Sequence, residues 1–208
     1  MKRILASIGL CLCHLLGSAQ VNDKGTFHAA VGIAGGAHAT TYEQHFLITT
    51  TTEDGAATVT YPIELGFGLA RVFSLGLLLE PGTYLDSLAT ESNRLLTLAI
   101  QPRFYLVNHD RFAWMASLQL GTSALRYQVE EGAIRYSSNY RGGHFGLSTG
   151  LGMYFGERVG IDLHLRYMAT SMDIKDHEVN GQQVDLALWS ANLSTRGVAV
   201  QASLAFKF

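Results

Sequence analysis

The sequence predicts an all-β fold, namely an eight-stranded antiparallel up-and-down transmembrane β-barrel preceded by a cleaved signal peptide. First, apolar and polar residues alternate through most of the chain, which is the two-residue period of a strand with two different faces. Second, only 15% of the residues are charged, against about 25% in an average soluble domain. Third, no apolar stretch beyond the amino-terminal segment approaches the roughly 20 residues of a spanning helix. A ring of strands would pair the backbone N–H and C=O groups with one another in lipid, so that no spanning helix is needed.

The first 19 residues have the three-part layout of a secretory signal peptide. Lys2 and Arg3 form a positive head, an apolar run covers residues 4–16, and small residues occupy 17–19. That apolar run is too short to cross a bilayer as a helix. We therefore expect cleavage after Ala19, which leaves a barrel domain over residues 20–208.

Two cysteines, Cys11 and Cys13, raise the alternative of a lipoprotein signal. Both lie in the middle of the apolar run rather than at its end, which favours ordinary cleavage. Their removal would leave a mature chain without disulfide or thiol chemistry. Without Lys2 and Arg3 the 15 basic residues fall to 13 against 17 acidic ones, a net charge of about −4, so nucleic acid is not an expected partner.

The alternation predicts eight strands, over residues 26–37, 60–73, 75–86, 94–107, 112–128, 142–155, 158–172 and 196–208. The connections alternate in length. The longer ones are expected at 40–59, 87–93 (of moderate length), 130–141 and 173–195, and short ones at Ser74, 108–111 and 156–157. This asymmetry is typical of barrels with long extracellular loops and short periplasmic turns, and it places both termini on the periplasmic side.

One face of each predicted strand is rich in Leu, Ile, Val and Phe, and the other in Gly, Ala, Ser, Thr and Gln. A soluble ligand-binding barrel would instead carry many charges on its outer face. We therefore assign the apolar face to lipid and the small, polar face to a narrow lumen. The expected lumen charges are Glu64, Glu80, Arg103, Asp162, His164, Arg166 and Lys207. Aromatic residues near the short turns predict a periplasmic girdle of Phe73, Phe104, Phe112, Trp114, Phe155, Phe206 and Phe208.

The segment 198–208 alternates and ends on the aromatic Phe208. It resembles the terminal assembly signal of outer-membrane barrels. With the signal peptide and the eight strands, the mature chain resembles the small OmpA/OmpX-type family and the outer membrane protein beta-barrel domain group. This resemblance implies a bacterial outer-membrane location, contact with outer-membrane lipid, and insertion by the barrel-assembly machinery after escort by periplasmic chaperones.

No arrangement of residues in the sequence points clearly to catalysis. His144 and Ser148 share a strand face but lie about 13 Å apart along it, whereas His164 could approach Ser148 across neighbouring strands. The strongest polar constellation is Asp162-x-His164-x-Arg166. It fits a salt-bridge ladder with Glu80 or Lys207, and a proton-linked or ligand site is the alternative reading.

Two further groups of residues could suggest a metal site. His28, His38 and His45 have no compact ligand spacing. Asp173, Asp176 and Glu178, followed by Asn180-Gly181, lack the ordered spacing of a calcium loop and favour a solvated turn. We expect no catalytic residue, no cofactor and no bound metal.

The function expected from the sequence is a structural or surface-interaction role in the outer membrane, without catalysis. An extracellular ligand would contact the loops at 40–59 and 173–195. The alternatives are a lipid-modifying enzyme resembling lipid A deacylases or acyltransferases, a passive pore, and a soluble secreted ligand-binding barrel. A narrow lumen filled by side chains argues against a wide pore.

Overall fold

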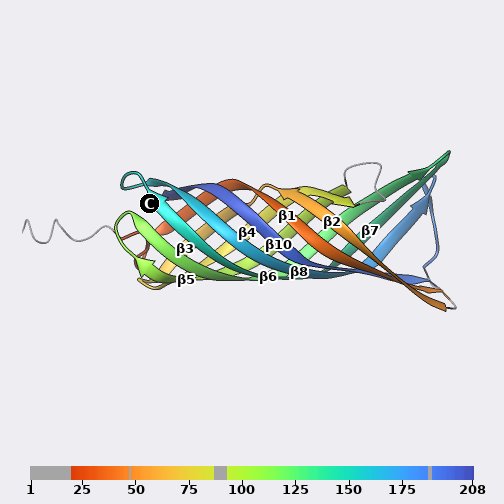
Figure 1. The fold of residues 1–208 in the computed structure, drawn as a ribbon, viewed down its shortest axis with the longest axis horizontal. Coiled ribbons are helices and arrows are strands. Elements are labelled where there is room, and N and C mark those ends of the chain that lie inside the picture. Colours follow the sequence, from red (N-terminus) through yellow and green to blue (C-terminus); the bar gives the residue numbers. More distant parts are fainter. Residues whose placement is uncertain (1–19, 47, 87–92, 187–188) are drawn as a thin grey trace, which may run out of the picture.

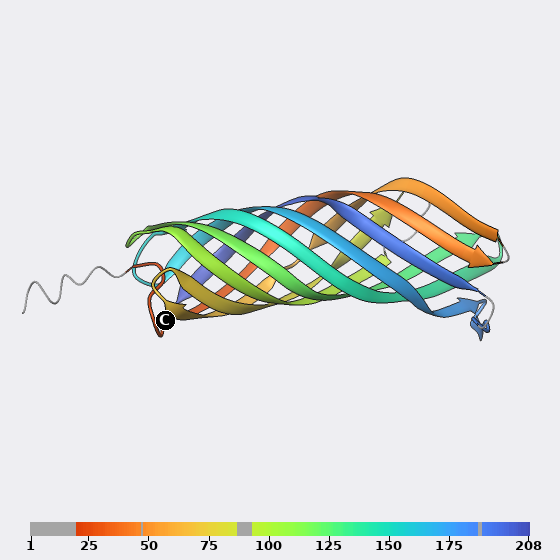
Figure 2. The same cartoon turned by 90° about the horizontal axis from the view of Figure 1, so that it is seen from below.

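The computed structural model describes residues 20–46, 48–86, 93–186 and 189–208, so the expected signal peptide lies outside the described residues. These residues form antiparallel strands wound around one long axis (Figures 1 and 2). The strands are β1 (Phe27–Phe46), β2 (Ile48–Thr60), β3 (Ile63–Ala70), β4 (Phe73–Asp86), β5 (Asn93–Asn108), β6 (Phe112–Glu131), β7 (Ile134–Tyr154), β8 (Val159–Val179), β9 (Gln182–Gln183) and β10 (Ser190–Lys207). Within the described residues, no helix is long and apolar enough to cross a membrane.

The strands form an eight-stranded ring in chain order, which confirms the predicted up-and-down arrangement. The first and last strands pair along their whole length, from His28 opposite Lys207 to His45 opposite Ser190. β2 and β3 share one place in the ring, because both lie between β1 and β4. β9 is a short addition that pairs only with the end of β8.

The break between β2 and β3 falls at Tyr61-Pro62. Proline has no backbone N–H, so Pro62 interrupts the ladder of hydrogen bonds. The neighbouring groups remain paired, since Tyr61 N donates to Pro81 O and Gly32 N donates to Pro62 O. The sequence prediction started this strand at residue 60 and placed the following turn at Ser74. That placement was wrong: the turn is at Arg71-Val72, and Ser74 is buried in β4.

Three of the four predicted long loops are mostly strand. β1 covers residues 40–46 and β2 covers residues 48–59, β6 and β7 meet at a short turn around Gly132, and β8 runs on to Val179. The fourth, at 87–93, lies largely outside the described residues. The strand ends opposite the termini, residues 40–46, 48–56, 126–141, 173–183 and 190–195, are called the rim extension below.

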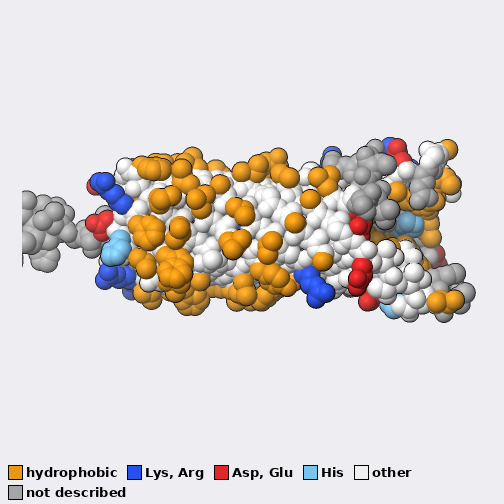
Figure 3. All heavy atoms as spheres, viewed as in Figure 1, with side chains coloured by type: hydrophobic (Ala, Val, Ile, Leu, Met, Phe, Trp, Pro, Cys, Tyr) orange, Lys and Arg blue, Asp and Glu red, His pale blue; other side chains and the backbone are white. Residues whose placement is uncertain are grey.

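An apolar band covers the outer wall between the rim extension and the end that carries the carboxy-terminus (Figure 3). Its central side chains are 41% to 63% exposed: Val31, Ile33, Leu77, Leu79, Leu98, Ile100, Leu120, Leu147, Leu163, Leu165, Val198 and Val200. An apolar surface of this extent is uncommon on a soluble monomer. The predicted aromatic girdle also lies at the expected end. Phe104, Phe112, Trp114, Phe155 and Phe208 are exposed there, whereas Phe73 and Phe206 are half-buried.

Candidate functional site

The centre of the lumen is occupied by a bidentate ion pair between Arg166 of β8 and Glu80 of β4. Arg166 Nη1 donates to Glu80 Oε1 and Nη2 donates to Oε2, each over 2.7 Å. Thr60 Oγ1 also donates to Glu80 Oε1. Both charged side chains are almost completely buried. Parallel bidentate bonds fix the two groups in one geometry, so this pair ties together walls that are remote in the sequence.

A second ion pair joins Arg103 of β5 to Glu64 of β3, nearer to the termini. Gln201 of β10 connects the two pairs. Its Nε2 donates to Glu64 Oε1 over 2.7 Å, and its Oε1 accepts from Arg166 Nη1 over 3.1 Å. The predicted lumen charges are therefore confirmed as buried, and the proposed partner Glu80 is confirmed for Arg166.

The other two members of the Asp162-x-His164-x-Arg166 constellation are less completely paired. Asp162 and His164 are 2% and 4% exposed. Asp162 Oδ1 and His164 Nε2 have no protein hydrogen-bond partner among the described residues. Lys207, the second proposed partner, instead donates to the backbone oxygen of Gln20 and lies over the ring of Tyr154. The constellation thus contributes one ion pair and two buried polar side chains that each have one unpartnered atom.

The histidine and serine pairs considered for catalysis are not joined by a hydrogen bond in the described structure. Ser148 lies opposite Arg166 in the β7–β8 register, whereas His164 lies opposite Gly150. Ser148 Oγ is 2.6 Å from Ser117 Oγ, and His144 Nε2 is 3.4 Å from the oxygen of Gln119. These contacts belong to the hydrogen-bond network of the lumen.

The three histidines weighed as a metal site lie at three different heights in the structure. His28 contacts Asn22 near the termini, His38 contacts Thr58 higher in the lumen, and His45 contacts Thr49 on the rim extension. Among the described residues, no group of three or more His, Cys, Asp or Glu side chains could hold a metal ion.

In the segment considered as a calcium loop, the acidic residues Asp173, Asp176 and Glu178 belong to strand β8 instead of the expected solvated turn, and only Asn180-Gly181 form a turn. Asn180 and Gly181 have φ angles of 51° and 79° and join β8 to β9. Positive φ at both central residues is the geometry that Asn-Gly favours in a two-residue hairpin. The expected turn at this position is therefore confirmed.

The end of the ring near the termini is closed by residues 20–22, a feature that the sequence analysis missed. Val21 and Asn22 are buried, and Val21 N donates to His109 O. Asn22 Nδ2 donates to the backbone oxygens of Ala70 and Arg71, and Asn108 Nδ2 donates to Asn22 O. The sequence gives little indication of this closure, since its main polar residue is a single Asn shortly after the expected cleavage site. The alternation of apolar and polar residues, which predicts the strands, carries no information about this segment.

Gly68 should be indispensable to this closure. A Cβ built at Gly68 would lie 2.0 Å from Asp23 O, so the side chain of Gly68→Ala would displace the segment that carries Asn22. We expect a loss of about 1–3 kcal/mol in the free energy of unfolding, as for overpacked sites. Urea unfolding in lipid vesicles measures this loss. Gly35→Ala is the matched control, because its Cβ would meet nothing within 4 Å. Equal stabilities of the two variants would contradict the prediction.

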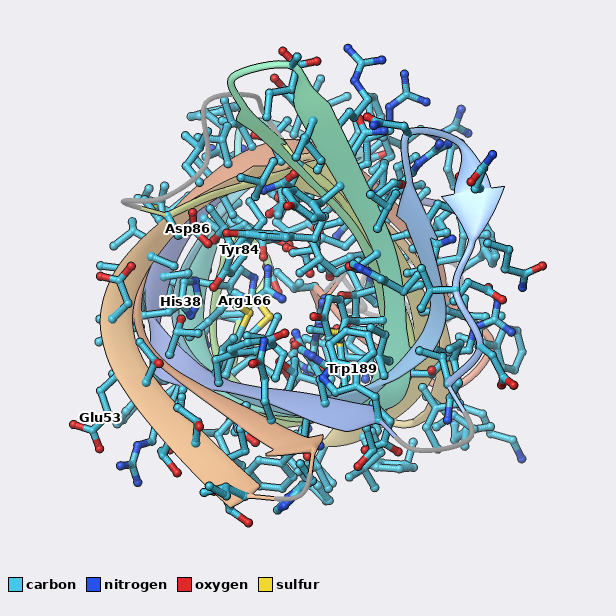
Figure 4. The ribbon with its side chains drawn as sticks, turned by 90° about the vertical axis from the view of Figure 1, so that its right-hand side faces the viewer. His38, Glu53, Tyr84, Asp86, Arg166 and Trp189 are labelled. Atoms are coloured by element: carbon cyan, nitrogen blue, oxygen red, sulfur yellow. The ribbon has the colours of Figure 1, made fainter. Side chains whose placement is uncertain are left out.

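A layer of aromatic and apolar side chains closes the lumen towards the rim extension (Figure 4). Tyr84 accepts or donates a 2.9 Å bond with Thr40, and Tyr140 donates to Tyr42. Trp189 packs edge-on against His177, with 4.8 Å between the ring centroids. On the rim extension, burial lowers the pKa of His177, which favours its neutral form beside Ser138.

Two small cavities lie in the lumen between the two closures. A cavity of about 20 Å³ lies beside Glu64, Arg103 and Asp162, and one of about 30 Å³ lies beside His38, Glu80 and His144. Each has room for an isolated water molecule or two. Neither is large enough for a drug-sized ligand, whose sites usually measure hundreds of cubic ångströms.

No protein-family model matches the chain, and no curated protein matches it in sequence. Among solved structures it is similar to the outer membrane protein OprG from Pseudomonas aeruginosa, with a TM-score of 0.52 and 11% identity over 90% of this chain and 97% of that one. It is also similar to the outer membrane protein AlkL in DMPC lipid bilayers, with a TM-score of 0.55 and 10% identity over 90% of this chain and 92% of that one. At such identities the likeness concerns the fold alone. The chain has the fold of the small outer-membrane β-barrel proteins.

Proposed function

We propose that this chain is an integral protein of the bacterial outer membrane that acts through contacts made by its rim extension outside the cell. The observation that carries the proposal is the continuation of β1–β2, β6–β7 and β8–β10 as paired strands beyond the apolar band. Short turns lie at the opposite end, and in barrels of this type short turns face the periplasm. The rim extension therefore faces outwards.

The rim extension supports a contact role because it is ordered by backbone pairing and carries a polar surface with charges of both signs. Thr51, Thr52 and Glu53 are exposed on β2, and Glu53 points away from the lumen (Figure 4). A surface already fixed in shape loses little conformational entropy on binding. This rigidity replaces the long flexible loops expected from the sequence.

The proposal includes neither conduction nor catalysis. The Arg166–Glu80 and Arg103–Glu64 pairs stand across the lumen, and the two cavities beside them, of about 20 and 30 Å³, have room for no more than a water molecule or two each. A lipid-modifying enzyme would need a nucleophile and base at the outer leaflet. The His144, His164 and Ser148 side chains are buried in the lumen instead.

Single cysteines can test the proposed orientation and contact. The two natural cysteines, Cys11 and Cys13, lie in the expected signal peptide, so an introduced thiol would be unique in the mature chain. An impermeant maleimide should label Thr51→Cys on intact cells, and Glu157→Cys, in the β7–β8 turn, only after the outer membrane is opened. The reverse pattern would overturn the orientation.

The proposed contact is tested with a photo-crosslinking amino acid placed at position 51 of the rim extension. On intact cells, position 51 should give a discrete protein or glycan adduct. Position 165, in the apolar band, should give lipid adducts alone. Absence of any adduct along residues 49–53 would contradict the contact role and leave a purely structural one.

A further inference from the structure

A basic hollow lies on the outer wall where the apolar band meets the rim extension. It measures about 400 Å³, and its basic side chains are Arg94, Arg126, Arg141 and Lys175. All four are exposed. Leu96 and Ala124 line it from the side of the apolar band.

The strand register forces these cations together. Arg94 of β5 lies directly opposite Arg126 of β6, and like charges in such a position destabilise a sheet. Neither arginine has an ion-pair partner among the described residues. The repulsion is compensated if an anion binds between them.

A β-bulge brings the fourth cation to the same place. Asn139 pairs with Asp176 and Tyr140 pairs with Ile174, so Lys175 is the extra residue of β8 and both Lys175 and Asp176 are exposed. Asp173 lies 3.7 Å from Lys175, and Asp176 also lines the hollow. The two carboxylates offset part of the charge, and an excess of basic charge remains.

We propose that the basic hollow binds the phosphate group of a phosphorylated lipid in the outer leaflet. Its height, just beyond the apolar band, is that of the lipid headgroups. The fork of each guanidinium matches the oxygens of a phosphate, and Leu96 and Ala124 would contact the first part of the acyl chains. A soluble anion would gain nothing from this apolar floor. The inference rests on the proposed membrane placement of the chain.

Native mass spectrometry of the full chain released from nanodiscs provides the test. The nanodiscs contain phosphatidylcholine with a minor fraction of phosphatidic acid, whose terminal phosphate is the probe. We expect retention of one phosphatidic acid molecule in preference to phosphatidylcholine. The double variant R94Q/R126Q should weaken that retention by roughly thirtyfold, given about fivefold per basic residue at a membrane surface.

Arg196→Gln supplies the matched control, because Arg196 is an exposed arginine of β10 that does not line the hollow. An equal loss in this variant would show a general effect of surface charge and would overturn the site. Retention unchanged in R94Q/R126Q would also overturn it. Displacement of the lipid by an equal concentration of inorganic phosphate would show a free-anion site instead of a lipid site.

The double variant is expected to fold, since it removes a repulsion, and its mobility on a gel without boiling checks this. A failure of the proposed function can be distinguished from a failure of the phosphate-lipid site. If thiol labelling places the rim extension in the periplasm, the outer-leaflet assignment fails, whereas phosphate-lipid retention in nanodiscs is still measured independently.

Discussion

Glu80→Ala should lower the free energy of unfolding by about 3–5 kcal/mol, the usual cost of removing one partner of a buried ion pair. Arg166 is 1% exposed and would lose both of its 2.7 Å bonds to Glu80, so that its charge would remain in the lumen without a counterion. The remaining bonds, to Gln201 and Gln119, come from neutral amides. Urea unfolding in lipid vesicles measures the loss, and the variant should also lose its compact form on an unboiled gel at a lower temperature.

Two further variants separate the charge from the packing. Glu80→Gln keeps the shape and one acceptor oxygen and should recover part of the loss. The double variant Glu80→Leu/Arg166→Met removes both charges and should be less destabilised than Glu80→Ala, because an apolar pair of similar volume replaces a buried ion pair at little cost. A loss below about 1 kcal/mol in Glu80→Ala would mean that water reaches Arg166, and the filled lumen would be refuted.

The members of this network could be predicted from the sequence, and their pairing only in part. Strand alternation places Glu64, Glu80, Arg103 and Arg166 on the lumen face regardless of register, because the period of a strand is two. Which side chains meet across the lumen depends on strand tilt and shear. Arg166 and Glu80 are 86 positions apart, and no local pattern relates them. Gln201, which links the two ion pairs, gave no signal beyond being polar on a lumen face.

The rim extension was misassigned for a different reason. Residues 49–52 are four consecutive threonines, polar on both faces, and alternation has no contrast to detect there. Yet β-branched threonine favours extended backbone, and pairing of β2 with β1 satisfies the backbone groups. The hydrophobic pattern therefore marks where a strand has one apolar face and where both of its faces become polar. It does not mark where the strand ends.

Leu165→Arg should cost about 2–4 kcal/mol, the expected penalty for a cation on the lipid face near the bilayer midplane. Leu165 is 56% exposed on β8, opposite Val200 of β10, within the apolar band. No side chain of the lumen network is touched by this change. Thr51→Arg, on the exposed rim extension, is the matched control and should stay within about 0.5 kcal/mol of the parent chain, as surface changes in water usually do. Urea unfolding in lipid vesicles compares the two.

The difference in the free energy of unfolding between Leu165→Arg and Thr51→Arg shows whether the outer wall is in contact with lipid or with water. In a water-exposed barrel, Leu165→Arg would resemble Thr51→Arg, because both side chains are exposed. If Leu165→Arg leaves the free energy of unfolding unchanged, the outer wall does not contact lipid. The outer-membrane placement and the phosphate-lipid site would then both be refuted. That result would leave the lumen ion pairs intact, since their energetics depend on burial inside the ring. A loss confined to position 165 would show that the exposed apolar band is stabilised by contact with hydrocarbon.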